Sequence, residues 1–322
     1  MLVNNWTKPE KLIKKSTRDA FGEALLALAK NNKDIVVVSA DLAESTRVQK
    51  FGQKYPARFV EVGVAEQNAM GVAAGLALSG KIPFLASFAV FSPGRNWDQL
   101  RVSVCYSQAN VKIVSTHSGL AVGEDGATHQ ALEDIAITRV LPNLTIIQPS
   151  DYNETLTVTK AVAKHQGPVY LRLTRQNSPV FTKVNNKFTI GQADILLRGT
   201  DITIVACGPI IYEALLAAYE LVEHKIKIEI INCPSIKPLD KNTILRSVKK
   251  TKKLITLEDH QKAGGLGSAI TEMLAQNYPV KTILMGVADT FGESGTSDQL
   301  WEKYGLSKKH IINNIRKLIS SK

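Results

Sequence analysis

The chain has 322 residues, 44% of them hydrophobic and 21% charged, a globular composition long enough for two domains with separate cores. No apolar run approaches the roughly 18 residues that a membrane span needs, and residues 1–15 lack a signal-peptide core, so we expect a cytoplasmic protein without a membrane partner. The net charge of +11 is concentrated in residues 241–253 and 303–322, where basic and apolar residues alternate as on solvated helix faces, so we expect anions such as sugar phosphates, not nucleic acid, as partners.

The first half of the chain alternates between helical patterns and short apolar runs. Helices are predicted over 16–29, with Ser16 as the N-cap, over 65–78, 95–107 and 152–164, and from about Ala131. Strands are predicted over 34–39, 59–63, 83–88, 111–115, 145–148 and 169–173. Continuous apolar strands separated by helices imply a mostly parallel sheet that is covered on both faces.

A second alternation follows residues 175–191, which have linker composition. Strands are predicted over 202–206, 226–231, 254–258 and 282–286, and helices over 212–222, 240–250 and 267–275 and twice more before the end. We therefore predict an α/β protein with two doubly wound domains, residues 1–185 and 190–322. Three widely spaced cysteines without a C-x-x-C pair argue against disulfides and structural zinc.

The run from Thr116 to Gln130 (T-H-S-G-L-A-V-G-E-D-G-A-T-H-Q) combines two histidines, two acidic residues and three glycines. Histidines beside carboxylates in a bent loop can exchange protons and hydrogen-bond hydroxyls. The same composition also suits a solvated turn. Because the run follows the predicted strand 111–115, and ligands bind at the carboxyl ends of strands in open α/β sheets, we favour a functional site.

Glu66 begins a predicted helix in the run V-E-V-G-V-A-E-Q-N-A-M-G-V-A-A-G-L-A. Nearly all of its helical neighbours are small or apolar, so its carboxylate has little polar company from its own segment. A buried carboxylate can act as a proton donor or share a proton near neutral pH. The alternative is an ordinary acid that stabilises a helix N-terminus.

Phe88 and Phe91 leave the end of a predicted strand in the run S-F-A-V-F-S-P-G-R-N-W-D-Q-L-R. Aromatic side chains in a strand-end loop can stack against a flat heterocycle, although packing in the core is an equal alternative.

Taken in this order, the three runs resemble the transketolase family of thiamine-diphosphate enzymes, and the resemblance covers nearly the whole chain. It implies a pyrimidine-binding domain over residues 1–185 and a transketolase C-terminal domain over 190–322. It also implies that Glu66 hydrogen-bonds a ring nitrogen of the cofactor's aminopyrimidine, and that Phe88 and Phe91 surround that ring. The third aromatic residue of larger relatives is missing near Pro93 and Gly94, so no cofactor contact is assigned to Trp97.

The resemblance also implies substrate contacts. Asp125 and His129 match residues that meet substrate hydroxyls near the reacting carbon, and Glu66, Asp125 and His129 are the expected catalytic residues. The groups that match the grip on the distant phosphate are Arg18, Ser45, His117 and Arg175. This division suits the side chains, since guanidinium groups fit phosphate geometry.

The family's G-D-G motif and downstream Asn, which hold Mg²⁺ and the diphosphate, are absent together with their whole domain. The resemblance therefore implies the C-terminal subunit of a split transketolase of the pentose phosphate pathway. Such a subunit would move a two-carbon ketol unit from a ketose phosphate to an aldose phosphate. We expect no metal ligands on this chain, an N-terminal partner that supplies them, an α2β2 heterotetramer and no activity of the chain alone.

Three alternatives remain open. A deoxyxylulose-phosphate synthase shares the glutamate and a similar loop, but carries its magnesium half in the same chain. The beta subunit of a 2-oxoacid dehydrogenase has this size but lacks the G-E-D-G-A-T-H-Q run. A scaffold subunit without activity could also have kept the fold, although Glu66, Asp125 and His129 are all retained.

Two runs of the second half have no role in this hypothesis. The run L-E-D-H-Q-K-A-G-G-L-G-S-A-I invites a dinucleotide-binding interpretation, but Ile270 stands where the fingerprint needs Gly or Ala, so a structural turn or an anion site is expected. The run G-V-A-D-T-F-G-E-S-G-T (286–296) falls in the family's C-terminal domain, whose implied role is dimer and subunit contact.

Overall fold

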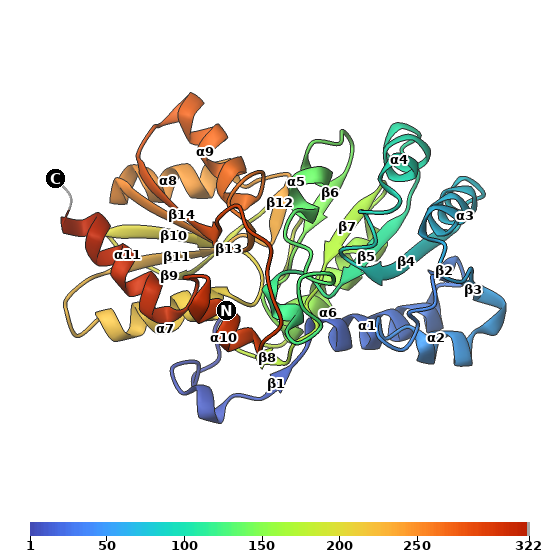
Figure 1. The fold of residues 1–322 in the computed structure, drawn as a ribbon, viewed down its shortest axis with the longest axis horizontal. Coiled ribbons are helices and arrows are strands. Elements are labelled where there is room, and N and C mark those ends of the chain that lie inside the picture. The colour runs from blue at the N-terminus through green and yellow to red at the C-terminus, as the bar shows by residue number, and fades with distance from the viewer. Residues whose placement is uncertain (321–322) are drawn as a thin grey trace.

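The computed structural model describes residues 1–320 and has an α/β fold with two mostly parallel sheets, as predicted (Figure 1). The first sheet has seven strands in the order β12-β6-β7-β5-β4-β2-β3. Its strands are β2 (Ile35–Ser39), β3 (Phe59–Glu61), β4 (Ile82–Phe88), β5 (Lys112–Thr116), β6 (Thr145–Ile147), β7 (Val169–Arg172) and β12 (Ser235–Lys237). All neighbours are parallel except β12, which is antiparallel to β6.

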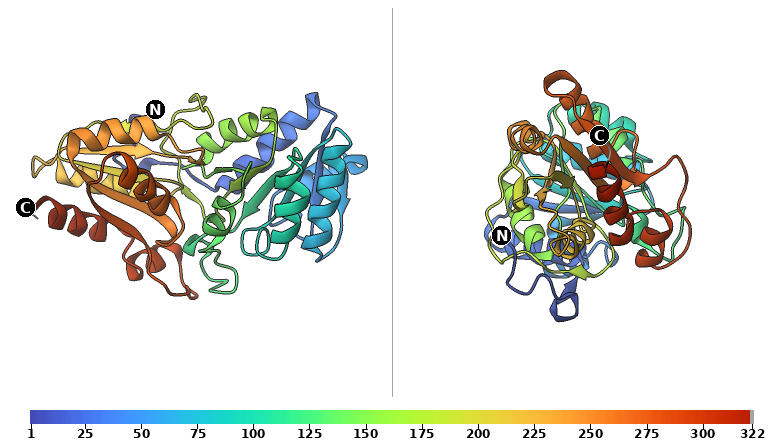
Figure 2. Two further views of the ribbon diagram at one scale, coloured as in Figure 1. Left: turned by 90° about the horizontal axis from the view of Figure 1, so that it is seen from above. Right: turned by 90° about the vertical axis from the view of Figure 1, so that its left-hand side faces the viewer.

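Helices cover both faces of the first sheet (Figures 1 and 2). They are α1 (Thr17–Asn31), α2 (Gln49–Lys54), α3 (Glu66–Leu78), α4 (Trp97–Gln99), the π-helix η3 (Leu100–Tyr106), α5 (Asp134–Arg139) and α6 (Tyr152–Lys164). Ser16 is the N-cap of α1, as predicted, and its hydroxyl accepts a hydrogen bond from the backbone N–H of Asp19. The helix predicted over 95–107 is confirmed as one helical run over 97–106, in which α4 passes directly into the π-helix η3.

The second sheet has five strands in the order β14-β13-β10-β11-β9. They are β9 (Asp194–Leu197), β10 (Ile202–Ala206), β11 (Ile228–Asn232), β13 (Lys253–Gln261) and β14 (Lys281–Val287). Its helices are α7 (Ile211–Leu221), α8 (Lys241–Thr251), α9 (Leu266–Asn277), α10 (Ser297–Lys303) and α11 (Lys308–Ser320). Short elements complete the chain: η1 (Pro9–Lys11), β1 (Lys14–Lys15), η2 (Pro56–Arg58), η4 (Leu120–Val122) and β8 (Ser178–Pro179).

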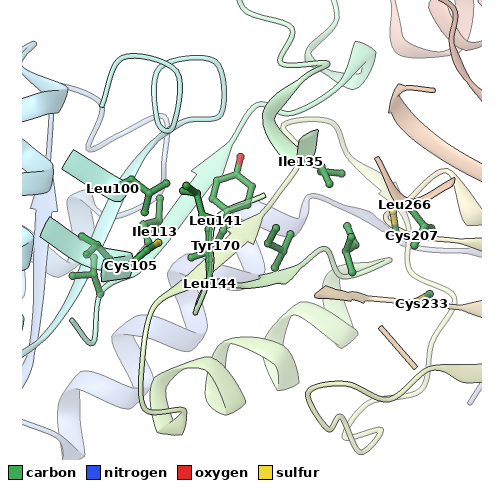
Figure 3. Close-up of a cluster of buried hydrophobic side chains, with 14 of the residues drawn as sticks. Leu100, Cys105, Ile113, Ile135, Leu141, Leu144, Tyr170, Cys207, Cys233 and Leu266 are labelled. Atoms are coloured by element: carbon green, nitrogen blue, oxygen red, sulfur yellow. The ribbon is translucent and has the colours of Figure 1, made fainter. Parts of the chain in front are cut away.

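The two halves of the chain are joined by more than a linker. Strand β12 belongs to the second half of the sequence but pairs with β6 of the first sheet. The sequence pattern did not predict this pairing. A buried apolar cluster also runs from Leu100 and Tyr170 in the first half to Cys207 and Leu266 in the second (Figure 3). The two domains with boundaries at 185 and 190 therefore stay a prediction.

The three cysteines, Cys105, Cys207 and Cys233, are free and buried. Within residues 1–320, no helix has the length and apolar character needed to cross a membrane.

Candidate active site

Aromatic rings gather at the carboxyl ends of β4 and β5. Phe88 is the last residue of β4, and its ring stacks on that of His117, with centroids 3.6 Å apart and planes at 23°. The ring of Phe91 stacks on that of Phe88, with centroids 5.7 Å apart and planes at 14°. His129 approaches Phe88 and Phe91 edge-on, at 6.2 and 5.6 Å. Residues from two separate runs of the sequence thus form one cluster, where an α/β sheet binds ligands.

His117 is held as a neutral acceptor at the buried side of this cluster. It is 2% exposed, and its Nε2 lies 3.4 Å from Nη1 of Arg18 while its Nδ1 lies 2.8 Å from Oγ1 of Thr116. Because a guanidinium can only donate, Nε2 accepts, and Nδ1 carries the proton that is donated to Thr116. Burial, followed by the charges of Arg18 and Arg175, lowers the pKa of His117 to about 2.

Glu66 is the first residue of α3 and is 5% exposed. Its Oε1 accepts a hydrogen bond of 2.9 Å from Nη1 of Arg95, and its carbonyl accepts one of 3.2 Å from Nδ2 of Asn96. The carboxylate therefore has a charged partner, supplied by the segment after β4 and not by its own helix. A cavity of about 390 Å³ beside Glu66 is lined by residues 64–68 and Arg95.

Arg95 connects Glu66 to the aromatic cluster. Its guanidinium carbon lies 4.1 Å from the centre of the Phe91 ring, within the range of a cation–π contact, while Nη1 bonds Glu66. Arg95 thus contacts both Glu66 and Phe91, two of the residues predicted to bind the cofactor. Trp97, to which no cofactor contact was assigned, donates from Nε1 to the carbonyl of Ile137 at 2.7 Å.

A second cavity, of about 380 Å³, contains three guanidinium groups and is called the anion pocket below. Its wall includes Arg18, Arg47 and Arg175 from the first half and Thr296, Ser297 and Asp298 from the second. Burial and the charge of Arg47 lower the pKa of Arg18 to about 10. Ser45 contacts Arg18 through its carbonyl, which accepts from Nη1 at 2.8 Å.

Arg175 connects the anion pocket to the glycine-rich run. Its Nη1 donates to the carbonyl of Val122 at 2.7 Å and lies 3.3 Å from Oδ1 of Asp125 and 3.6 Å from Oε2 of Glu124. Asp125 therefore faces Arg175, while His129 faces the two phenylalanine rings. The two residues that the resemblance assigns to the same hydroxyls have different neighbours in this structure.

Arg47 and Arg95 were not predicted as site residues. Arg47 follows Ser45 by two positions, adopts a left-handed backbone conformation with φ of 67° and bonds Oδ1 of Asp19 through Nε at 2.6 Å. Arg95 stood in the run that was singled out for its aromatic residues. The sequence did show an arginine within a few residues of Ser45 and of Phe91. It did not show which way these arginine side chains point.

Within the part of the chain that the structure describes, no three or more His, Cys, Asp or Glu side chains are grouped so that they could hold a metal ion. The location of the Mg²⁺ ligands on a partner chain stays a prediction.

Two family models match this chain: the transketolase pyrimidine-binding domain over residues 13–180 and the transketolase C-terminal domain over residues 191–311. A putative transketolase C-terminal section from Methanocaldococcus jannaschii is 44% identical, over 94% of this chain and 95% of the relative. A 6-deoxy-6-sulfo-D-fructose transketolase subunit from a Clostridium species is 42% identical, over 92% of each. A solved split-gene transketolase, described as an inactive beta4 tetramer, is 43% identical with a TM-score of 0.88, over 95% of this chain and 98% of that one.

Proposed function

Because the chain belongs to the transketolase family as a split transketolase-type subunit, we propose that it is the C-terminal half of a two-chain transketolase. The complete enzyme moves a two-carbon ketol unit from a ketose phosphate to an aldose phosphate with thiamine diphosphate. One observation carries the proposal: the contacts run without a break from Glu66 through Arg95, Phe91, Phe88 and His117 to Arg18.

The residues at the Glu66 end of this row fit the aminopyrimidine ring of the cofactor. A carboxylate that is 5% exposed stands beside a cavity, and Arg95, which lines the same cavity, lies over the ring of Phe91. Glu66 would hold the ring nitrogen, and Phe88 and Phe91 would bound the ring. When bound, the cofactor supplies the nucleophilic carbon that takes up and passes on the two-carbon unit.

The anion pocket at the other end supports a phosphorylated substrate. Three guanidinium groups around one cavity suit the oxygens of a phosphate, since arginine donates in a planar fork. His117 is neutral because of its lowered pKa, and its Nδ1 already donates to Thr116. Its Nε2 can accept a hydrogen bond from a sugar hydroxyl in place of the one from Arg18. This pocket favours a transketolase over a 2-oxoacid dehydrogenase subunit, whose substrates carry no phosphate.

Within the proposal, Asp125 and His129 contact the hydroxyls of the sugar between these two ends. His129 already faces the aromatic rings, and Asp125 lies at the edge of the anion pocket beside Arg175. An acid and an imidazole are suited to hydroxyl groups because both can exchange protons with them. A scaffold subunit would need none of these contacts.

The remaining parts of the proposal concern the assembly. An N-terminal partner subunit supplies the Mg²⁺ and diphosphate ligands, and the active form is an α2β2 heterotetramer. The inactive state of the beta4 tetramer of the split-gene relative supports this partner dependence. We place the enzyme in the cytoplasm and in the pentose phosphate pathway, and its three free cysteines fit a reducing compartment.

The test compares the purified chain alone with its mixture with a partner that carries G-D-G and a following Asn. We expect ketol transfer from a ketose phosphate to an aldose phosphate only in the mixture, with thiamine diphosphate and Mg²⁺ present. Full activity of the isolated chain would overturn the split-subunit proposal. Activity of the mixture with pyruvate as the donor, and none with a ketose phosphate, would instead support a synthase or dehydrogenase subunit.

A further inference from the structure

The run from Thr116 to Gln130, called the reaction loop below, is held from the second half of the chain. Its turn η4 (Leu120–Val122) contacts β13 and α10. Oδ1 of Asp259 accepts from the backbone N–H of Leu120 at 2.8 Å, and Oδ2 accepts from that of Ala121 at 3.1 Å. Asp259 belongs to β13, which continues past the predicted end at residue 258.

We propose that Asp259 is a positioning residue for the substrate's phosphate end: it fixes the turn Leu120–Val122, and through it Arg175, in the anion pocket. The inference rests on the proposed function. It assigns a role in the reaction to the run L-E-D-H, which had none.

The carboxylate of Asp259 is fully engaged and shielded from water. It is 3% exposed, and a third donor, Nε1 of Trp301, bonds Oδ2 at 3.1 Å. Charge-assisted hydrogen bonds of this kind are about twice as strong as neutral ones. Burial raises the pKa of Asp259. The charge of Arg172 and these three donors act in the opposite direction and favour the ionised carboxylate.

The loop backbone is shaped to meet this carboxylate. Gly119 has φ of 74°, and a Cβ at this position would lie 2.4 Å from Oδ2 of Asp259. Only glycine permits both the conformation and the close approach. The contact is therefore built from both sides, by the loop and by the strand.

The tip of the reaction loop is also braced by the second half. Oγ of Ser294 donates to the carbonyl of Glu124 at 2.5 Å, and Nε2 of Gln130 donates to the carbonyl of Glu293 at 2.9 Å. The run 286–296, for which only subunit contact was expected, thus touches the loop that carries the candidate substrate residues.

The consequence for the substrate passes through Val122. Its carbonyl, one residue after the two amides that Asp259 holds, accepts the 2.7 Å hydrogen bond from Arg175. If the turn shifts, Arg175 loses its anchor and the anion pocket changes shape, while Glu66 and the phenylalanine rings keep their own contacts. Loss of Asp259 should therefore weaken phosphate recognition more than it slows the chemical step.

The experiment uses the full chain reconstituted with its partner, and compares a phosphorylated aldose acceptor with a short unphosphorylated one. In Asp259→Asn an NH2 group replaces one of the two oxygens that accept from the backbone N–H groups of Leu120 and Ala121. We therefore expect KM for the phosphorylated acceptor to rise about tenfold. The kcat/KM for the unphosphorylated acceptor should change less than threefold. Ser294→Ala should raise KM for the phosphorylated acceptor by about two- to threefold. This second variant tests the same loop contact with the second half if Asp259→Asn does not fold.

Glu272→Gln is the matched control, because it makes the same acid-to-amide change and also breaks a contact between the halves. Oε1 and Oε2 of Glu272 accept hydrogen bonds from the guanidinium of Arg139, which ends α5 outside the reaction loop. We expect wild-type KM for this control. Equal losses with both acceptors, or no change in either, would overturn the positioning role. An inactive wild-type mixture would instead contradict the proposed function itself.

Discussion

The imidazole of His117 lies face to face with the ring of Phe88, with centroids 3.6 Å apart. The contact follows from register, because Phe88 in β4 pairs with Thr116 in β5, and His117 is the next residue. The resemblance assigned Phe88 to the cofactor and His117 to the distant end of the sugar phosphate. In the structure these two regions share a wall, so a change at either ring reaches both.

The first prediction concerns Glu66. In the reconstituted enzyme, Glu66→Gln should lower kcat at least about a hundredfold, because an amide can neither carry the charge nor share a proton with the cofactor ring. Steady-state ketol transfer measures the loss. Asp98→Asn is the control, since it makes the same change at an exposed position in the segment that carries Arg95. Unchanged turnover of Glu66→Gln would remove the catalytic role and support a scaffold subunit.

Much of the fold could be predicted because its information is local. The apolar runs that became β2, β4, β5 and β10 and the cap at Ser16 need no distant partner to be recognised. The pairing of β12 with β6 and the antiparallel edge strand β9 could not be predicted, because both are short and depend on long-range contacts.

The same distinction holds at the candidate site. Phe88, His117 and Glu66 could be singled out because each stands at the end of a strand or the start of a helix, where side chains of parallel strands converge. The partnership of Arg95 with Glu66 could not, because it depends on the path of the segment after β4. Asp259 was missed because its partners in the reaction loop, Leu120 and Ala121, are more than a hundred residues away.

The second prediction follows from the place of Arg95. Its guanidinium bonds Glu66 and covers Phe91, the two groups that the proposed function gives to the cofactor ring. A cofactor ring that contacts both Glu66 and Phe91 must displace the guanidinium of Arg95. Arg95→Ala should therefore lower the Kd for thiamine diphosphate in the reconstituted enzyme. A three- to tenfold change corresponds to the roughly 1 kcal/mol of a part-exposed cation contact.

Titration of the cofactor, followed by intrinsic fluorescence, measures this Kd. Arg101→Ala is the matched control, because Arg101 lies on η3 and not on Phe91. Weaker cofactor binding by Arg95→Ala would mean that Arg95 helps to hold the cofactor instead of competing with it.

The third prediction concerns Arg47, which the sequence did not single out. If its charge assists Arg18 and Arg175 in the anion pocket, Arg47→Ala should raise KM for the sugar phosphate about tenfold and leave kcat nearly unchanged. The exposed Lys50 provides a control of the same charge three positions away. If Lys50→Ala raises KM as much as Arg47→Ala, only the general positive field matters, and the pocket assignment of Arg47 is wrong.

The fourth prediction concerns stability. Arg172 is fully buried, and its guanidinium bonds both carboxylate oxygens of Asp134, through Nε at 2.7 Å and Nη2 at 3.0 Å. Asp134→Ala leaves this charge without its partner, so it should lower the free energy of unfolding by about 3 kcal/mol or more. Urea denaturation measures the change. Glu272→Ala, which removes the more exposed partner of Arg139, should cost less than about 1 kcal/mol.

The fifth prediction uses the lowered pKa of His117. In the unfolded chain a histidine binds a proton below about pH 6.5, whereas the folded chain refuses it until about pH 2. Between these values the unfolded state binds more protons, so stability falls as the pH falls below 6.5. The titration of His117 alone should lower the free energy of unfolding by about 2 kcal/mol between pH 7 and pH 5.

His117→Gln cannot take up that proton in either state, so its free energy of unfolding should depend less steeply on pH than that of the wild type. Comparing urea midpoints at pH 7 and pH 5 cancels the other groups that titrate, since they are common to both proteins. His224→Gln is the control, because it makes the same substitution at an exposed position. Equal slopes for His117→Gln and the wild type would mean that His117 is charged in the folded protein at pH 5, and its position as a neutral acceptor from Arg18 would have to be abandoned.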